Sequence, residues 1–313
     1  GTYFLPHQSY PNECVQWYEY TGVFGGSFWI LLLNVLIFDL YIYRNTLLRP
    51  VKRRTIYIIS ASLIVVLPLL LSWGIYSSID PEEGEHSIDV VVVQPSIDPY
   101  TKFGPDYQNQ LEKMLSLAEE KMDSSVDYIL MPETALVEDF WENDIQTSWS
   151  VNRLYKYRTK YPDLCIITGA ATGRYFIQDE QPTATARKFK NQPGWYDNYN
   201  TALQIDSTHA LSIYHKSKLV PGSEKLPFPK YLQYLEKYAL DLGGTKGSLG
   251  VQERRSVFVH PTLKSGIAPV ICYESIYGDY VGEYIRNGAR YIFIMTNDGW
   301  WDDSPGYKQH LSY

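Results

Sequence analysis

Three reactive side chains follow short apolar runs in this sequence, where predicted strands end. Cys272 ends the run "GIAPVIC", Glu133 follows "YILMP", and Lys216 follows "ALSIYH". Runs of this length, bounded by turn residues and rich in β-branched or aromatic side chains, are typical of buried strands. Because α/β enzymes place reactive groups beyond the carboxyl ends of strands, a thiol, a carboxylate and an amine are candidates for catalytic groups here.

Each of the three also has a non-catalytic interpretation. A free cysteine is usually a small buried hydrophobe, Glu133 could cap a helix or be solvated, and a loop lysine such as Lys216 is usually solvated. If they act together, Glu133 could take the proton of Cys272 and later return it. The Lys216 ammonium, with a backbone N–H of the turn, would stabilise the thiolate and the oxyanion of a tetrahedral intermediate.

The elements that would position these groups follow an α/β pattern. Strand-like runs recur from residue 88 onward, and the segment between the first two has apolar residues at helical spacing. Strand, helix and strand in this order predict a layered α/β domain over residues 88–313. Residues 174–197, polar with Pro and Gly, predict a long loop or hairpin. The expected strands lie within residues 88–95, 127–133, 164–170, 199–206, 210–217, 256–260, 266–272 and 290–298, and the apolar helix face consists of Leu111, Met114, Leu115, Ala118 and Met122.

Two apolar segments precede this domain. Residues 24–43 are apolar apart from Asn34 and Asp39, and residues 55–76 carry no charge. Each has about the 20 residues needed to cross a bilayer core. A signal peptide has a shorter apolar region and would not come second in a pair. We therefore predict two transmembrane helices rather than two buried core helices.

The loop between these segments, residues 44–54, contains five Arg and Lys residues. Short basic loops remain in the cytoplasm. The prediction is a cytoplasmic loop at 44–54, an extracytoplasmic loop at 1–23, a linker at 77–87, and a domain at 88–313 outside the cytoplasm.

The composition excludes several classes of protein. A hydrophobic content of 45% argues against disorder. A net charge of −7 without a long basic run does not predict a positively charged surface for binding nucleic acid. We expect no metal or cofactor, because no cluster has metal-ligand spacing and no glycine-rich phosphate loop follows a strand. Of the three cysteines, at least one must be free, and Cys165 in "LCIITGA" is expected to be inert core.

In chain order, the segments "LMPETA", "YHKSKLVPGSE", "VICYES" and "TNDGWW" resemble the motifs of the carbon–nitrogen hydrolase (nitrilase) superfamily. The two apolar segments and "LVPGSEKLPF" are similar to its apolipoprotein N-acyltransferase branch. The resemblance implies a nitrilase-like α-β-β-α sandwich tethered to transmembrane helices, with Glu133, Lys216 and Cys272 as the catalytic triad. It also implies a fragment, since known members have more spans before Gly1 and one after the domain.

The resemblance further implies transfer of an acyl chain from a phospholipid, through a Cys272 thioester, to the N-terminal amine of the diacylglyceryl-cysteine of apolipoproteins. The implied location is the bacterial inner membrane, with the catalytic domain on the periplasmic side. Family members often carry a tryptophan near the position at which this sequence has Phe103, so the sequence departs from the family pattern there. The resemblance also matches Glu224, Tyr273 and Glu274 to positions that support the triad. Aromatic residues near the site would contact lipid unless they serve ordinary packing, and they include Phe103, Trp300 and Trp301.

Two other functions fit the same residues. A membrane-tethered amidase or nitrilase would use the same triad with water as the final acceptor. A catalytically silent membrane scaffold would retain only the sandwich. The paired spans favour a lipid substrate, and the intact set of Glu133, Lys216 and Cys272 argues against the scaffold.

Overall fold

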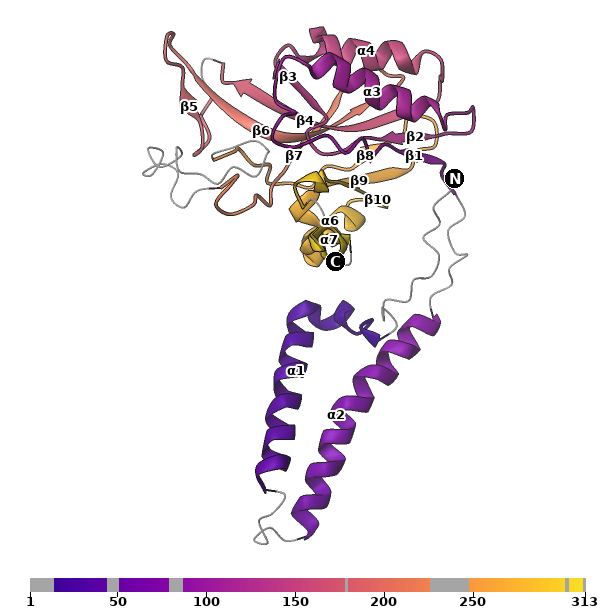
Figure 1. The fold of residues 1–313 in the computed structure, drawn as a ribbon, viewed down its shortest axis with the longest axis vertical. Coiled ribbons are helices and arrows are strands. Elements are labelled where there is room, and N and C mark those ends of the chain that lie inside the picture. The colour runs from indigo at the N-terminus through magenta and orange to yellow at the C-terminus, as the bar shows by residue number, and fades with distance from the viewer. Residues whose placement is uncertain are drawn as a thin grey trace. The chain divides into compact units, whose positions relative to one another are not determined.

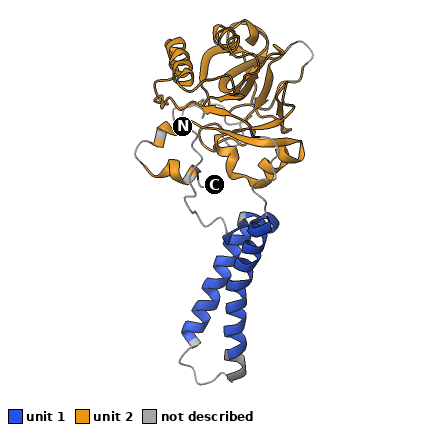
Figure 2. Ribbon diagram, turned by 90° about the vertical axis from the view of Figure 1, so that its right-hand side faces the viewer, with its two compact units in different colours: residues 1–87 blue, residues 88–313 orange. Residues whose placement is uncertain are grey.

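The computed structural model describes residues 14–43, 51–78, 87–177, 180–225, 248–301 and 304–311. The chain divides into two compact units, residues 1–87 and residues 88–313, which Figure 2 shows in blue and orange.

The first unit contains the two long apolar helices that the sequence predicts. Helix α1 covers Tyr18–Tyr43, with a kink at Gly22, and helix α2 covers Val51–Ser78. Within them, Phe24–Ile42 and Thr55–Ser78 are long and apolar enough to cross a membrane by length and composition. Only 6% of each of these windows is buried within the protein, so their apolar side chains are not covered by other parts of the described chain.

A contact between the two helices compensates for a proline inside α2. Pro68 has no N–H, so it cannot bond to the carbonyl of Ile64, four residues earlier. The indole Nε1 of Trp29 on α1 donates to that carbonyl at 2.6 Å. An apolar environment makes an unpaired carbonyl costly, so this bond suits a helix pair in lipid.

The second unit is built on two sheets. The larger contains seven strands, and the smaller has the order β10-β9-β8. In the larger sheet the path is β1-β2-β4-β6-β5, with β3 beside β4 and β7 beside β6. Its strands are β1 Val90–Val92, β2 Tyr128–Leu130, β3 Leu136–Trp141, β4 Cys165–Tyr175, β5 Arg187–Lys188, β6 Trp195–Ile205 and β7 Ser212–His215. Those of the smaller sheet are β8 Phe258–Val259, β9 Gly266–Ile271 and β10 Ala289–Met295.

Helices α3, α4 and α6 lie on the outer faces of the two sheets (Figure 1). Helices α3 and α4 cover the larger sheet, and α6 packs on β9 and β10 of the smaller one. The result is the predicted α-β-β-α order of layers. The helices are α3 Tyr107–Glu119, α4 Trp149–Arg158, α6 Gly278–Arg286 and α7 Gly306–Leu311, and the 3-10 turns are η2 Ile145–Thr147, η4 Cys272–Ile276 and η5 Asp298–Trp301.

Strand alternation divides the apolar side chains between two cores. On β2, Ile129 points into the core under α3 and α4, whereas Tyr128 and Leu130 point into the core between the sheets. On β4, Ile166 and Cys165 alternate in the same way. Cys165 is fully buried between the sheets, as the sequence predicts.

Each predicted strand is present, and the predicted face of α3 is buried at Leu111, Met114, Leu115 and Ala118. The segment 174–197 is a hairpin, because β4 and β6 pair out to Tyr175 and Tyr196. Strand β3 and helices α4 and α6 are additional elements that the sequence interpretation omitted.

Candidate active site

Glu133 lies in the turn that follows β2. Beyond the strand, the Met131 N–H still donates to the carbonyl of Ile167 at 2.8 Å, and the chain then turns through Thr134, whose φ is +46°. Strand β4 passes this turn at Gly169, where a Cβ would lie 2.5 Å from the Thr134 nitrogen. A glycine is therefore required at 169 for β4 to approach the glutamate so closely.

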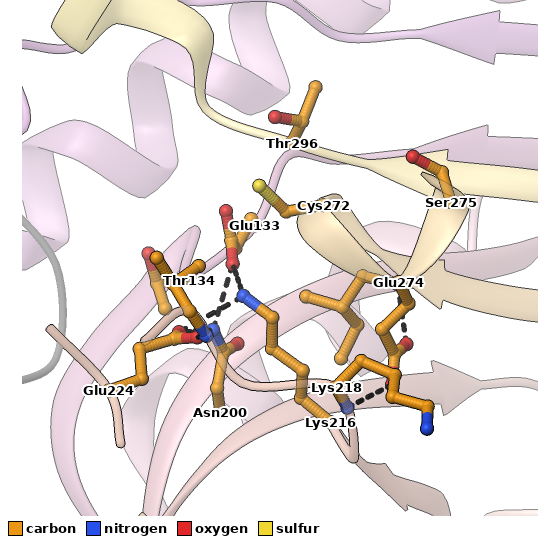
Figure 3. Close-up of polar contacts among 12 residues, drawn as sticks. Glu133, Thr134, Asn200, Lys216, Lys218, Glu224, Cys272, Glu274, Ser275 and Thr296 are labelled. Atoms are coloured by element: carbon orange, nitrogen blue, oxygen red, sulfur yellow. Dashed lines mark hydrogen bonds and ion pairs between the residues drawn. The ribbon is translucent and has the colours of Figure 1, made fainter. Parts of the chain in front are cut away.

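Lys216 directly follows β7, and its side chain is almost completely buried. Its backbone N–H continues the pairing with β6, donating to the Asn200 carbonyl at 2.8 Å. Its Nζ donates to Glu133 Oε1 at 2.9 Å and to Glu224 Oε1 at 3.0 Å. One ammonium thus joins two carboxylates from different segments (Figure 3).

Asn200 on β6 makes the same two connections through its amide. Its Nδ2 donates to Glu133 Oε1 at 2.8 Å and to Glu224 Oε1 at 3.0 Å. Because both acceptors are carboxylate oxygens, the amide must present its NH₂ group to them. Glu224 is fixed further by the Val220 N–H, which donates to its Oε2 at 2.9 Å. We call Glu133, Asn200, Lys216 and Glu224 the Lys216 cluster.

Cys272 stands at the first residue after β9, where the strand turns into η4. Its φ is +45°, a left-handed conformation that is uncommon for a residue with a side chain. Figure 3 shows its sulfur directed toward the Glu133 carboxylate, with Thr296 on its other side. The structure therefore brings Glu133, Lys216 and Cys272 together at the ends of β2, β7 and β9.

The charges of the site follow from burial and from these contacts. Burial alone would raise the pKa of the Glu133 carboxyl, but the Lys216 ammonium outweighs it and holds this pKa below its ordinary value. Burial would lower the pKa of Lys216, yet Glu133 and Glu224 raise it well above its ordinary value. Burial, together with the Glu133 charge, raises the pKa of the Cys272 thiol to about 12. The resting site holds a carboxylate, an ammonium and a thiol.

This arrangement is suited to nucleophilic chemistry at an acyl carbon. A buried thiol reacts once a neighbouring base removes its proton, and Glu133 is an ionised carboxylate in the right place. Lys216 is fixed as an ammonium, so it can stabilise negative charge near the sulfur without giving up its proton.

Glu274 has a different environment, although it lies only two residues beyond Cys272. It is fully buried, and its Oε1 accepts from the hydroxyls of Tyr214 at 2.7 Å and Tyr280 at 2.6 Å. The backbone N–H groups of Ser217 and Ile271 donate to its two oxygens at 2.7 and 2.9 Å. It lies outside the Lys216 cluster and connects the segment after Lys216 to the end of β9.

The remaining predicted site residues are aromatic. Tyr273 is half-buried, with its ring edge-on to Tyr277 at 5.4 Å. Phe103 is 40% exposed and lines a cleft of about 400 Å³ between the loop after β1 and strands β3 and β4. Trp301 packs against Gly306 at the start of α7. The side chain of Trp300 lies outside the described residues.

Several polar residues near the site were missed by the sequence interpretation. Asn200 and Lys102 are buried polar residues, in a strand and a loop respectively. His310, interpreted from the sequence as structural, lies within 3.4 Å of the Cys272 carbonyl and 3.1 Å of Asp298. The signal for Asn200 was its inward position in the alternation of β6, but a polar residue in a strand gives no indication of its partner. Among the described residues, no group of His, Cys, Asp and Glu side chains could hold a metal ion.

The profile of the carbon–nitrogen hydrolase family matches residues 90–312, which is most of the chain. The chain therefore belongs to the carbon–nitrogen hydrolase family, as its motifs predict.

Two curated relatives, both named apolipoprotein N-acyltransferase, match most of the chain. The chain is 28% identical over 310 residues to an apolipoprotein N-acyltransferase of Chlorobaculum tepidum, covering 95% of this chain and 55% of that protein. It is 24% identical to the protein of that name from Aquifex aeolicus, covering 92% of this chain and 54% of the relative. The chain thus spans about half the length of these relatives.

Solved structures of low sequence identity also match. An amidase from Nesterenkonia sp. is 15% identical with a TM-score of 0.38, covering 67% of this chain and 64% of the amidase. A glutamine-dependent NAD+ synthetase from Acinetobacter baumannii is 13% identical with a TM-score of 0.36, covering 66% of this chain and 32% of the synthetase.

Proposed function

We propose that the protein is an N-acyltransferase that moves an acyl chain from a phospholipid to the N-terminal amine of a diacylglyceryl-modified apolipoprotein. The observation that carries the proposal is the meeting of Glu133, Lys216 and Cys272 in one site, where Lys216 is buried and the other two are partly exposed. The names of the curated relatives support the choice of donor and acceptor.

The first half-reaction forms a thioester on Cys272. Glu133 takes the thiol proton, and the sulfur attacks the ester carbonyl of the phospholipid to give a tetrahedral oxyanion. Lys216 and a backbone N–H of the η4 turn stabilise the charge on that oxygen. The carbon–oxygen ester bond then breaks, Glu133 returns the proton to the leaving alkoxide, and the lysophospholipid departs.

The second half-reaction transfers the chain to an amine. The free N-terminal amine of the acceptor attacks the thioester carbonyl, and Glu133 takes one amine proton. When the carbon–sulfur bond breaks, this proton returns to the sulfur of Cys272, which restores the resting thiol. Water would complete the cycle in an amidase, so the acceptor distinguishes the two activities.

The two apolar helices support placement of this site at a lipid surface. In our proposal residues 24–43 and 55–76 span the bacterial inner membrane, and the basic loop 44–54 faces the cytoplasm. Residues 1–23 would then be extracytoplasmic. The linker 77–87 would lead to a periplasmic catalytic domain at 88–313.

The predicted supporting residues take secondary roles in this proposal. Phe103 lies beside a cleft and remains partly exposed, which suits contact with an acyl chain. Trp301 and Tyr273 would add apolar surface near the thioester, and Trp300 remains a predicted lipid contact whose side chain lies outside the described residues. Glu224 pairs with Lys216 and would keep the ammonium oriented.

Intact-mass spectrometry tests the proposal. The protein in detergent, incubated with phospholipid alone, should accumulate one covalent acyl adduct on Cys272, because no amine is present to discharge it. Adding a diacylated lipopeptide with a free amino terminus should remove the adduct and yield an N-acylated lipopeptide.

Two variants serve as controls for the site of attachment. Cys272→Ser should lose the adduct, while Cys165→Ser should retain it if it folds. Discharge in water, with release of free fatty acid and no N-acylated product, would replace the proposal with an amidase. The absence of any adduct would overturn it.

The orientation has its own test. Ser207 lies in an exposed turn of the catalytic unit. In a Cys14→Ser background, Ser207→Cys should react with a membrane-impermeant maleimide added to intact spheroplasts. Labelling only after the membrane is permeabilised would reverse the topology.

A further inference from the structure

A second buried lysine lies beside the Lys216 cluster and is not explained by the triad. Lys102, in the loop after β1, is 5% exposed, and its Nζ donates to the Thr134 hydroxyl next to Glu133. Its main chain is fixed at both ends, since its N–H donates to Asp98 O at 3.1 Å and Gln110 donates to its carbonyl at 2.9 Å. The loop therefore holds this side chain in the site.

The Lys102 ammonium has fewer partners than its burial requires. An ammonium has three N–H donors, and among the described residues it has one hydrogen-bond acceptor and no ion pair. Burial lowers the pKa of Lys102 to about 8, although Glu133 and Cys272 oppose this effect. The Nζ also lies 5.3 Å from the centroid of the Phe103 ring. A buried ammonium with one hydrogen-bond acceptor and one ring contact still costs folding free energy, so its presence calls for a functional reason.

The Lys216 cluster supplies that reason. Glu133 and Glu224 each bond the same Lys216 Nζ and the same Asn200 Nδ2, so two carboxylates lie close together around one ammonium. Carboxylates in such proximity, away from water, tend to share a proton. A protonated Glu133 could not accept the proton of Cys272. Lys216 is shared by both carboxylates, so a second positive charge nearby adds to its effect and further favours the ionised form of Glu133.

We propose that Lys102 is a positioning residue that keeps Glu133 ionised, so that Glu133 can accept the Cys272 proton. Its charge offsets the second carboxylate of the cluster, and its bond to Thr134 places it on the turn that bears Glu133. When the Sγ–H bond breaks, the proton moves to a Glu133 oxygen and the electron pair stays on sulfur. The inference rests on the proposed role of Glu133 as the base.

The charged and titratable groups facing Glu133 come from five segments. They are Lys102 after β1, Lys216 after β7, Glu224 in the following turn, Cys272 after β9 and His310 on α7. The hydrogen bond to Asp298 raises the pKa of His310 above its ordinary value, so the experiment must separate the effect of His310 from that of Lys102.

The test measures the rate of Cys272 alkylation by iodoacetamide against pH, in a Cys14→Ser background, without lipid. The rate should fall on the acidic side where Glu133 becomes protonated. We call this fall in rate the acidic limb of the pH profile. In Lys102→Met the acidic limb should move to higher pH by about one unit. At pH values below the limbs of both proteins, the variant should therefore react about tenfold more slowly than the unsubstituted protein. Lys102→Arg should keep the limb of the unsubstituted protein. Lys113→Met, which removes an exposed lysine of α3, serves as the matched charge control.

Several outcomes would overturn the inference. A Lys102→Met rate that is lower at every pH with an unmoved limb would indicate a structural role alone. A shift that disappears in a His310→Gln background would assign it to His310. If Lys102→Met does not fold, Thr134→Val, which retains the lysine but removes its acceptor, should shift the limb in the same direction. An unmoved limb there would also contradict the inference.

A spectroscopic readout gives the same answer without a reaction. At a pH between the acidic limbs of Lys102→Met and the unsubstituted protein, Lys102→Met should show the infrared band of a protonated carboxyl. This band should be absent from the double variant that also carries Glu133→Gln. The unsubstituted protein should lack this band. A shifted limb without any phospholipid adduct would refute the acyl-transfer function and leave the role of Lys102 standing.

Discussion

The regions around Glu133 and Glu274 contain two carboxylates with opposite surroundings, and the side chain of Glu133 is 13% exposed while Glu274 is fully buried. Glu133 bonds the ammonium of Lys216 and the amide of Asn200, and faces a thiol. Glu274 bonds the hydroxyls of Tyr214 and Tyr280 and several backbone N–H groups. A carboxylate whose oxygens are both occupied by neutral donors is held in place, whereas one beside a thiol can exchange a proton.

The origin of the donors to Glu274 shows what it holds together. Ile271 ends β9, Ser217 follows Lys216, and Tyr280 belongs to α6. One side chain therefore fixes the strand that presents Cys272 relative to the segment that presents Lys216. In our proposal, Glu133 carries the chemistry and Glu274 maintains the geometry that the chemistry needs.

The largest expected effect is that of Glu133→Gln. Glutamine keeps the size of the side chain and an oxygen for Lys216, but it cannot accept the thiol proton. We expect acyl-adduct formation to slow by about a hundredfold or more, with little change in the thermal unfolding midpoint. The measurement is the rate of the mass increment on Cys272. A loss of less than tenfold would contradict the assignment of Glu133 as the base.

Glu274→Gln should have the opposite effect, with a larger loss of stability than of adduct rate. Its NH₂ group would oppose an N–H or O–H donor at a fully buried position, leaving a buried donor unsatisfied. The free energy of unfolding should fall by about 1–3 kcal/mol, with a smaller loss of adduct rate than in Glu133→Gln. Chemical denaturation measures this, and Glu120→Gln on the exposed end of α3 is the matched control. Equal stability with a hundredfold rate loss would make Glu274 a reacting group.

The positions of the three residues of the proposed triad could be predicted because strand ends are visible in sequence. The runs before Glu133, Lys216 and Cys272 gave the three locations, and the family motifs connected them. The family motifs also separated Glu274, as a supporting residue, from Glu133, but the surroundings of Glu274 could not be predicted. They depend on the 3-10 turn after Cys272, which carries Glu274 away from the thiol toward Tyr214 on another strand.

The elements missed in the fold have a similar cause. Strand β3, "LVEDFW", has two adjacent acidic residues at its centre, and helix α4, "WSVNRLYKYR", has mixed composition, so neither has a strong periodic pattern. Both are stabilised by tertiary contacts, such as Glu138 of β3, which accepts from the Trp149 and Ser150 N–H groups at 3.0 and 2.8 Å at the start of α4. Contacts of this kind are not readable from local sequence.

Acid should affect the stability of the Glu133 region in a defined direction. The folded pKa of Glu133 lies below its ordinary value of 4.5, so its ionised form stabilises the fold above that value. This contribution is lost as the pH falls through the lower, folded pKa. Thermal unfolding measured on the acidic side of 4.5 should therefore show a weaker pH dependence in Glu133→Gln than in the unsubstituted protein. An identical dependence would mean that Glu133 is not ionised in the fold.

The smallest expected effect is that of Tyr280→Phe, which removes one donor from Glu274 and retains the ring. The stack of Arg255 on that ring, 3.9 Å from its centroid, should persist. Glu274 Oε1 keeps the Tyr214 hydroxyl and the Ser217 N–H as donors, so no buried group is left without a partner. The free energy of unfolding should fall by about 0.5–1.5 kcal/mol, and the acyl-adduct rate should be unchanged. A rate loss approaching that of Glu133→Gln would mean that the Tyr280 hydroxyl takes part in proton transfer, and Glu274 would then belong to the chemistry as well as to the geometry.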